Sequence, residues 1–229
     1  MTEKTMPVQK SVNMRQMFMV FVGSMLVSGV LIFVLVSQFV TLPETPSYTD
    51  IVIQSEGGVR TIVPPRPLMD FTLPSHTGEA LSLSSLQGDY TLLYFGYTHC
   101  PDVCLMTLND LRKVRDHLGE DADALNYVFV SVDGERDTPA QITRYFATRR
   151  ASDFILGLSG DETTLQRIGV DYDLFYQLND DADQNANYSV DHTARIYLIN
   201  PQQELSAIFA YGTDPEAIAD YIKELIPST

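Results

Sequence analysis

No charged residue occurs between Gln16 and Pro43, a run of 28 positions made up mainly of Met, Phe, Val, Leu and Ile. About 20 apolar residues in a helix are enough to cross the hydrocarbon core of a bilayer. A cleaved signal peptide is the alternative, but its apolar region spans only about 7–15 residues and ends in a small-x-small site. The tripeptide Ser37-Gln38-Phe39 is a poor site of that kind. We therefore expect residues 16–42 to form an uncleaved transmembrane anchor.

The charges before this run predict its orientation. The first 15 residues carry three basic side chains and one acidic one, namely Lys4, Lys10, Arg15 and Glu3. Positive flanks stay in the cytoplasm, so residues 1–15 are expected to be cytoplasmic and the acidic remainder to face outward, where disulfides are tolerated. The N-terminus has no Arg- and Ser-rich presequence. This favours a single-pass protein of the bacterial cytoplasmic membrane, with its outer domain in the periplasm, over one of the mitochondrial inner membrane.

Composition and charge exclude several classes of protein. The chain has 30 Asp and Glu residues against 15 Lys and Arg, a formal charge of −15. Such a surface repels phosphates, so we expect no nucleic-acid partner. Two cysteines are too few for a disulfide-rich miniprotein. Five prolines between positions 43 and 67 indicate that residues 43–65 form a linker and residues 66–229 one compact domain.

Strand and helix patterns alternate along the outer part of the chain. Residues 91–97 and 125–133 are nearly continuous apolar runs, typical of strands buried on both faces. Apolar residues between them recur at helical spacing, and residues 214–226 predict a closing helix. Two short runs, residues 51–54 and 59–63, flank Gly57-Gly58 and predict a small hairpin. We therefore expect an α/β fold in which helices flank a mixed sheet and an N-terminal hairpin is added to it.

Both cysteines lie between a predicted buried strand and a predicted helix, in Thr98-His99-Cys100-Pro101-Asp102-Val103-Cys104. Open α/β sheets bind ligands at the carboxyl ends of their strands, and a helix N-terminus favours a thiolate. Residues four apart share a helix face and rise about 6 Å, near the upper limit of the Cα separation in a disulfide. Cys100 and Cys104 can thus form a structural disulfide, a reactive dithiol or part of a metal site. The residues alone leave these three interpretations open.

A metal site would need a third ligand, and the chain has four histidines. His76 is expected to be solvated in a hairpin turn, and His117 to lie near the surface of the helix that follows the cysteines. His99 adjoins Cys100, but neighbouring side chains diverge in an extended segment. His192 precedes a late strand, and the loop that enters such a strand in a mixed sheet can face the cysteine segment.

Three blocks of the sequence resemble the Sco/SenC copper chaperone family. Residues 94–104, Tyr-Phe-Gly-Tyr-Thr-His-Cys-Pro-Asp-Val-Cys, are similar to the signature of that family. Residues 131–139, Ser-Val-Asp-Gly-Glu-Arg-Asp-Thr-Pro, are similar to its second block, and residues 188–193, Tyr-Ser-Val-Asp-His-Thr, to its third. The blocks follow the order of the family, and the resemblance covers about residues 66–226.

The resemblance implies a thioredoxin-like fold and copper, as Cu(I) or Cu(II), bound by Cys100, Cys104 and His192. It also implies delivery of this copper to the dinuclear copper centre of cytochrome c oxidase subunit II. Other copper chaperones or thiol reductants would be further partners, and the N-terminal helix would tether the protein to the membrane. Thiolates select Cu(I), and imidazole suits both copper states. Asp191 is then either a group that orients the imidazole or a surface carboxylate.

The sequence departs from the family pattern at two positions, Leu105 and Gly134, where the family often has proline. Neither position is a predicted ligand, and backbone preference explains both. Asp133 and Asp137 also match positions of the family, and a turn and a helix cap are sufficient to explain them.

The main rival function is a membrane-anchored thiol–disulfide oxidoreductase that reduces cysteines of the oxidase subunit or of other exported proteins. Cys100 and Cys104 would be its redox pair. Two features disfavour it: the Cys-x3-Cys spacing exceeds the redox Cys-x2-Cys spacing by one residue, and the facing loop carries His192 where thioredoxin-type reductases place a proline. A Cys2His zinc site is a second rival, but the sequence shows no general base for zinc-dependent hydrolysis. A peroxidase is a third, but the activating groups it needs are not seen around Cys100.

Overall fold

The computed structural model describes residues 18–19, 25, 28–30, 52–179 and 188–226. The chain divides into two units, residues 1–47 and residues 48–229. The described residues of the first unit are helical and exposed. Within the described part of the chain, no helix has both the length and the apolar character needed to span a bilayer. The predicted anchor (16–42) and the predicted cytoplasmic segment (1–15) lie outside the described residues except at those few positions.

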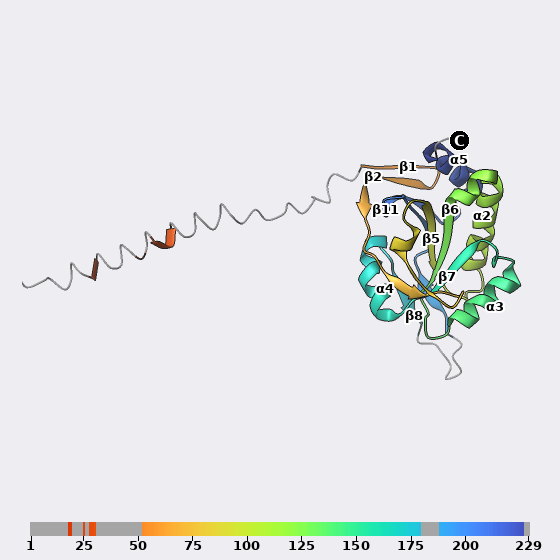
Figure 1. Ribbon diagram of the computed structural model, residues 1–229, viewed down its shortest axis with the longest axis horizontal. Helices are drawn as coiled ribbons and strands as arrows, with labels where there is room; N and C mark the ends of the chain where they lie inside the picture. The colour runs from red at the N-terminus through yellow and green to blue at the C-terminus, as the bar shows by residue number, and fades with distance from the viewer. Residues whose placement is uncertain (1–17, 20–24, 26–27, 31–51, 180–187, 227–229) are drawn as a thin grey trace, which may run out of the picture. The chain divides into compact units, whose positions relative to one another are not determined.

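A mixed sheet of seven strands forms the second unit, in the order β1-β2-β11-β10-β5-β6-β7 (Figure 1). The neighbours β5, β6 and β7 are parallel, and the other neighbouring pairs are antiparallel. The expectation of a mixed α/β sheet is confirmed. The strands are β1 (Val52–Glu56), β2 (Val59–Pro67), β5 (Tyr90–Gly96), β6 (Leu125–Ser131), β7 (Ile155–Ser159), β10 (Arg195–Ile199) and β11 (Glu204–Ala210).

Helices cover both faces of this sheet, which explains why β5 and β6 consist mainly of apolar, buried residues. Connections between parallel strands are right-handed, so α2 and α3, which follow β5 and β6, lie on one face. There α2 packs against α5, whereas α4 lies on the other side of the sheet (Figure 1). The helices are α2 (Val103–Leu118), α3 (Pro139–Arg149), α4 (Glu162–Gly169) and α5 (Pro215–Leu225), with 3-10 turns at Leu83–Leu86, Gly119–Ala124 and Val170–Tyr172.

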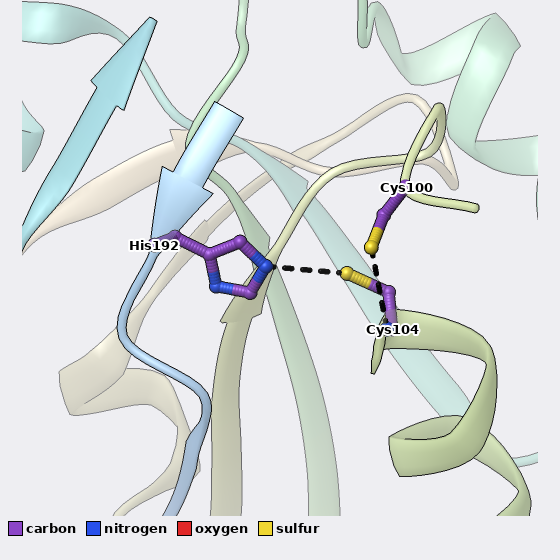
Figure 2. A group of neighbouring side chains, drawn as sticks. All are labelled: Cys100, Cys104 and His192. Carbon is purple, nitrogen blue, oxygen red and sulfur yellow. Dashed lines mark hydrogen bonds between the residues drawn. The ribbon is translucent and has the colours of Figure 1, made fainter. Parts of the chain in front are cut away.

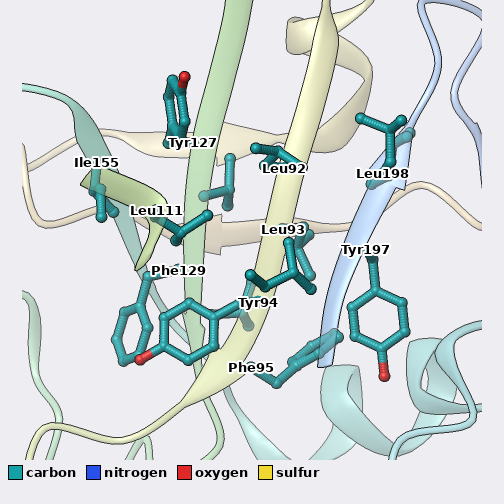
Figure 3. Packing of buried hydrophobic residues seen from close by; sticks show 14 of the residues in the cluster. Leu92, Leu93, Tyr94, Phe95, Leu111, Tyr127, Phe129, Ile155, Tyr197 and Leu198 are labelled. Atoms are coloured by element: carbon teal, nitrogen blue, oxygen red, sulfur yellow. The ribbon is translucent and has the colours of Figure 1, made fainter. Parts of the chain in front are cut away.

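The core beneath the end of β5 is rich in aromatic rings (Figure 3). The ring of Phe129 on β6 lies 5.3 Å from that of Tyr94 on β5 and 5.7 Å from that of Phe146 on α3. On the β10 side, Phe95 meets Tyr172 and Tyr197 edge to face, at 5.1 and 5.8 Å. These contacts fix the carboxyl end of β5, where the cysteine segment begins.

The N-terminal hairpin belongs to the main sheet. Its second strand, β2, pairs with β11 as well as with β1, so much of the expected linker, residues 43–65, forms an edge of the sheet. Pro64 and Pro65 lie where β2 bulges away from β11, between the pairs Thr61↔Ala207 and Arg66↔Leu205. Proline is tolerated there because it has no N–H to give to a ladder.

Two short hairpins lie beside the main sheet. The first, β3 (Thr72–Pro74) with β4 (Ala80–Ser82), contains the hairpin turn that was expected at His76 and bridges to β7 through Ser75 and Leu158. The second, β8 (Tyr176–Leu178) with β9 (Val190–His192), was not expected. Its strands have three residues each, and the Asp- and Asn-rich residues 179–187 separate them in place of a short turn like the one around Gly78, so no local pattern predicted it. This second hairpin carries His192.

We expect Gly134→Ala to lower the free energy of unfolding by about 1–3 kcal/mol, the usual cost of overpacking. A Cβ atom at this position would lie 2.0 Å from the carbonyl oxygen of Gly160, a backbone atom that cannot swing aside. Urea denaturation measures the change. The exposed neighbour offers a matched control, since Glu135→Ala should stay within about 0.5 kcal/mol of the parent. Equal stability of both variants would contradict the close approach of these two loops.

Candidate metal centre

The two thiols lie where β5 passes into α2. Cys104 is the second residue of α2, whereas Cys100 lies in the turn before it. The expectation that both cysteines share a helix face is therefore wrong. Pro101 accounts for this, because a residue that precedes proline is disfavoured in helical geometry. Both cysteines are free, 8% and 0% exposed respectively, and the backbone N–H of Cys104 donates to Cys100 Sγ at 3.4 Å.

An imidazole from the second hairpin faces these thiols (Figure 2). His192 on β9 is half-buried, and its Nε2 lies 3.4 Å from Cys104 Sγ. Its ring meets Tyr97 edge to face at 5.8 Å. The two sulfur atoms and one imidazole nitrogen lie within 4.8 Å of one another. One ion can be reached by all three side chains, so the structure brings together the three residues that the resemblance implies.

The backbone orients this imidazole. Nδ1 of His192 lies 3.2 Å from the carbonyl oxygen of Thr193, which leaves Nε2 directed at the sulfur. The carboxylate of Asp191, the alternative orienting group, is exposed and has no hydrogen-bond or ion-pair partner among the described residues, whereas its backbone pairs with Gln177 on β8. Successive residues of a strand point to opposite faces, so Asp191 is the surface carboxylate of the two options considered.

The other three histidines lie apart from the thiols. His117 is exposed on α2, as expected. His76 is not merely solvated: its Nδ1 accepts the N–H of Gly157 at 3.0 Å, and its ring packs on Phe146 at 5.2 Å. Burial lowers its pKa. His99 has a side chain that is 45% exposed, with Nδ1 at 3.5 Å from Asp137 Oδ1.

A buried carboxylate holds the cysteine segment in place. Asp137 is 0% exposed and accepts three hydrogen bonds: from the backbone N–H of Thr98 at 2.7 Å, from Thr98 Oγ1 at 2.6 Å and from Ser131 Oγ at 2.7 Å. It thereby joins the segment after β5 to the end of β6. The expected role of Asp137 as a helix cap is wrong, because Thr138 caps α3 by accepting the N–H of Gln141.

A second acidic residue from the same loop secures the segment that leads to His192. Arg136 Nε donates to Asp133 Oδ2 at 2.5 Å, and one of its terminal nitrogens donates to the carbonyl oxygen of Tyr188 at 2.8 Å. The Tyr188 hydroxyl donates to Asp133 Oδ1 at 2.7 Å, and the guanidinium lies 3.4 Å from the centre of the Tyr188 ring. Sequence reasoning missed this role. Its available signal was an Asp-x3-Asp pair directly after a buried strand, at the edge where such sheets bind ligands.

The two thiols differ strongly in acidity. The hydrogen bond from the Cys104 thiol is the main cause that lowers the pKa of Cys100 to about 4, assisted by His192 and by backbone N–H groups and opposed by burial. The same bond, together with burial, raises the pKa of Cys104. Cys100 is therefore a thiolate at neutral pH, with Cys104 as its hydrogen-bond donor. Before any metal binds, the pair therefore already carries one of the two negative charges that a site with two thiolate ligands requires.

Comparison with known proteins finds relatives of this chain. A sequence model of the SCO1/SenC family matches residues 61–227. The SCO2-like protein of Rickettsia felis is 29% identical over 154 residues, which is 67% of this chain and 74% of that one. The copper-bound structure of Bradyrhizobium japonicum ScoI is 35% identical, with a TM-score of 0.63 over 70% of this chain and 99% of that one. Yeast Sco1 with copper bound is 26% identical, with a TM-score of 0.63 over 72% and 91%.

We expect iodoacetamide to alkylate Cys100 alone in the reduced full chain, because the thiolate is the nucleophile. The rate should stay nearly constant from about pH 8 down to about pH 5 and fall as the pH nears the Cys100 pKa of about 4. Mass spectrometry of peptides identifies the labelled cysteine. Cys104→Ala removes the main cause of the low pKa, so its rate profile should move toward about pH 8.5, the value of a free cysteine. A parent profile already centred near that value would contradict the charge distribution described.

Proposed function

The chain belongs to the SCO1/SenC family, and we propose that it is a copper metallochaperone that binds copper through Cys100, Cys104 and His192. The convergence of two thiols and one imidazole within 4.8 Å carries the proposal. The recipient that we propose is the dinuclear copper centre of cytochrome c oxidase subunit II. Copper is the cargo of this protein, so the same site must both hold the ion and give it up.

The donor set suits copper better than the other metals considered. Soft thiolates select Cu(I), and imidazole suits copper in either oxidation state. Cys100 is already a thiolate, so binding has to remove a proton only from Cys104. Oxidation of both thiols to a disulfide would remove two ligands at once. The redox state of the pair can therefore control loading and release, with a thiol reductant or another copper chaperone as a further partner.

The position of the site supports transfer by ligand exchange. Cys100 lies in the turn that precedes α2, at the carboxyl edge of the sheet, and is 8% exposed, whereas Cys104 is fully buried. An incoming cysteine of the recipient can approach from the side of Cys100 while Cys104 still holds the ion. We propose that residues 16–42 anchor the chain in the bacterial cytoplasmic membrane with the site in the periplasm. This tether would keep donor and recipient in one membrane plane.

A thiol–disulfide oxidoreductase is the second candidate function, and the low pKa of Cys100 favours it. A thiolate beside a protonated thiol is the arrangement that attacks a disulfide and then resolves the mixed disulfide. The substrate would be cysteines of the oxidase subunit or of other exported proteins. This chemistry uses Cys100 and Cys104 and does not need an imidazole ligand, so His192 separates the two functions.

Anaerobic titration of the reduced full chain with Cu(I) should give one bound ion per chain. In the His192→Ala variant the affinity should fall by at least about tenfold, since loss of an outer-shell partner alone costs about 10–100-fold. Competition with a chromophoric Cu(I) chelator measures both. His117→Ala is a matched control, because that histidine is exposed on α2, and it should bind like the parent.

The same variants test the second candidate. Reduction of a disulfide-bonded peptide from a copper-binding segment should be unchanged in His192→Ala and abolished in Cys100→Ser. Copper binding that is indifferent to His192, combined with full reductase activity, would contradict the chaperone proposal and favour the oxidoreductase.

A further inference from the structure

The side chain of Tyr94 on β5 carries a polar group that the core does not satisfy. Tyr94 is 1% exposed, and its ring packs against Phe129 (Figure 3). Its hydroxyl oxygen is buried and has no partner in hydrogen-bond geometry among the described residues, although Cys104 lies close enough for the two groups to interact. Buried tyrosine hydroxyls usually have a partner, because an unpaired polar group in the core costs free energy. This hydroxyl therefore has an unused capacity to donate.

The sulfur of Cys104 lies beside this hydroxyl. Gly96, two residues after Tyr94, ends β5 on the same face of the sheet. A Cβ atom at Gly96 would lie 2.8 Å from the Tyr94 hydroxyl oxygen and 3.0 Å from Cys104 Sγ. The Tyr94 oxygen and the Cys104 sulfur thus border the same small space, which the Cβ atom of any residue other than glycine at position 96 would fill. His192 approaches the same sulfur at 3.4 Å.

Toward a sulfur that has lost its proton, the phenol can act only as a donor. A tyrosine phenol keeps its proton at neutral pH, because its ordinary pKa is about 10. Metal binding requires Cys104 to lose its proton. The sulfur is then a buried anion, and hydrogen bonds to charged groups are stronger than those between neutral groups. Hydrogen bonding around a cysteine sulfur also tunes the properties of a copper site.

We propose that Tyr94 is a positioning residue of the copper site, whose O–H donates a hydrogen bond to the sulfur of Cys104 once copper has replaced the thiol proton. The displaced proton leaves to solvent, and the phenol forms no covalent bond. The Tyr94 hydroxyl would then affect the copper affinity through the sulfur of Cys104, without contacting the ion itself. This inference rests on the proposed function, since it concerns the same bound copper.

The test is Tyr94→Phe in the full chain, which removes one oxygen atom. We expect the Cu(I) affinity, measured against a chromophoric chelator, to fall about tenfold, the loss of a hydrogen bond to a charged group. In the Cu(II) form, the sulfur-to-copper charge-transfer band should shift to lower energy, because the sulfur lone pairs lose a stabilising donor. The urea midpoint of the metal-free variant should equal or exceed that of the parent, because the lost hydroxyl had no partner.

Tyr172→Phe is the matched control. The Tyr172 hydroxyl is also buried without a partner among the described residues, and Tyr172 is 0% exposed. It packs against Phe95 and Tyr197 instead of bordering Cys104. This variant should match the parent in copper affinity and in the charge-transfer band.

The remaining outcomes distinguish failure of this inference from failure of the proposed function. Parent-like affinity and spectrum in Tyr94→Phe, with one His192-dependent copper in the parent, would refute the role of Tyr94 and leave the proposed function intact. A lowered urea midpoint of metal-free Tyr94→Phe together with parent-like copper affinity and charge-transfer band would make the hydroxyl a structural group and refute its role at the copper site. Failure of the parent to bind copper at all would refute the proposed function, and this inference with it.

Discussion

The approach of His192 Nε2 to Cys104 Sγ, at 3.4 Å, joins two segments that are 88 positions apart in the sequence. Neither segment could hold its position alone, because Cys100 lies in a turn and His192 ends a strand of three residues. Both are secured by the loop between β6 and α3. Asp137 holds the cysteine segment through Thr98, and Asp133 with Arg136 holds the chain leading to His192 through Tyr188. One loop that contributes no sulfur or imidazole ligand thus sets the distance between the ligands.

The cost of burying charge explains why this loop can act as a scaffold. An unpaired buried carboxylate is strongly destabilising, and both aspartates escape that cost only while their partners stay in place. Asp133, Asp137 and His99 also lie within 4.8 Å of one another. The carboxylate oxygens of both aspartates already accept hydrogen bonds from protein donors, however. Asp133 and Asp137 therefore hold neighbouring segments in place and are not metal ligands in our interpretation. The metal site that we propose is the other group, Cys100, Cys104 and His192, in which sulfur and nitrogen face one another.

The sheet was predicted from local sequence patterns, whereas the full set of proposed ligands was predicted from the family resemblance. Apolar runs and helical spacing were enough for β5, β6, α2 and α5, because buried elements leave strong periodic signals. The two cysteines marked one side of the site by their position after a buried strand. His192 was predicted as a ligand through the resemblance, because β8 and β9 are short and no tight turn between them marks their hairpin in the sequence. The roles of Asp133, Asp137 and Tyr94 depend on contacts between distant segments, which no local pattern carries. The membrane anchor stays a prediction from composition.

Copper K-edge X-ray absorption of the full chain loaded with one equivalent of Cu(I) tests the proposed site most directly, since it counts the atoms bound to the ion. Two sulfur scatterers and one imidazole nitrogen are expected in the parent, and the nitrogen should be lost in His192→Ala. A shell with fewer than two sulfur atoms, or a nitrogen that persists without His192, would show that Cys100, Cys104 and His192 are not the ligands and would contradict the account.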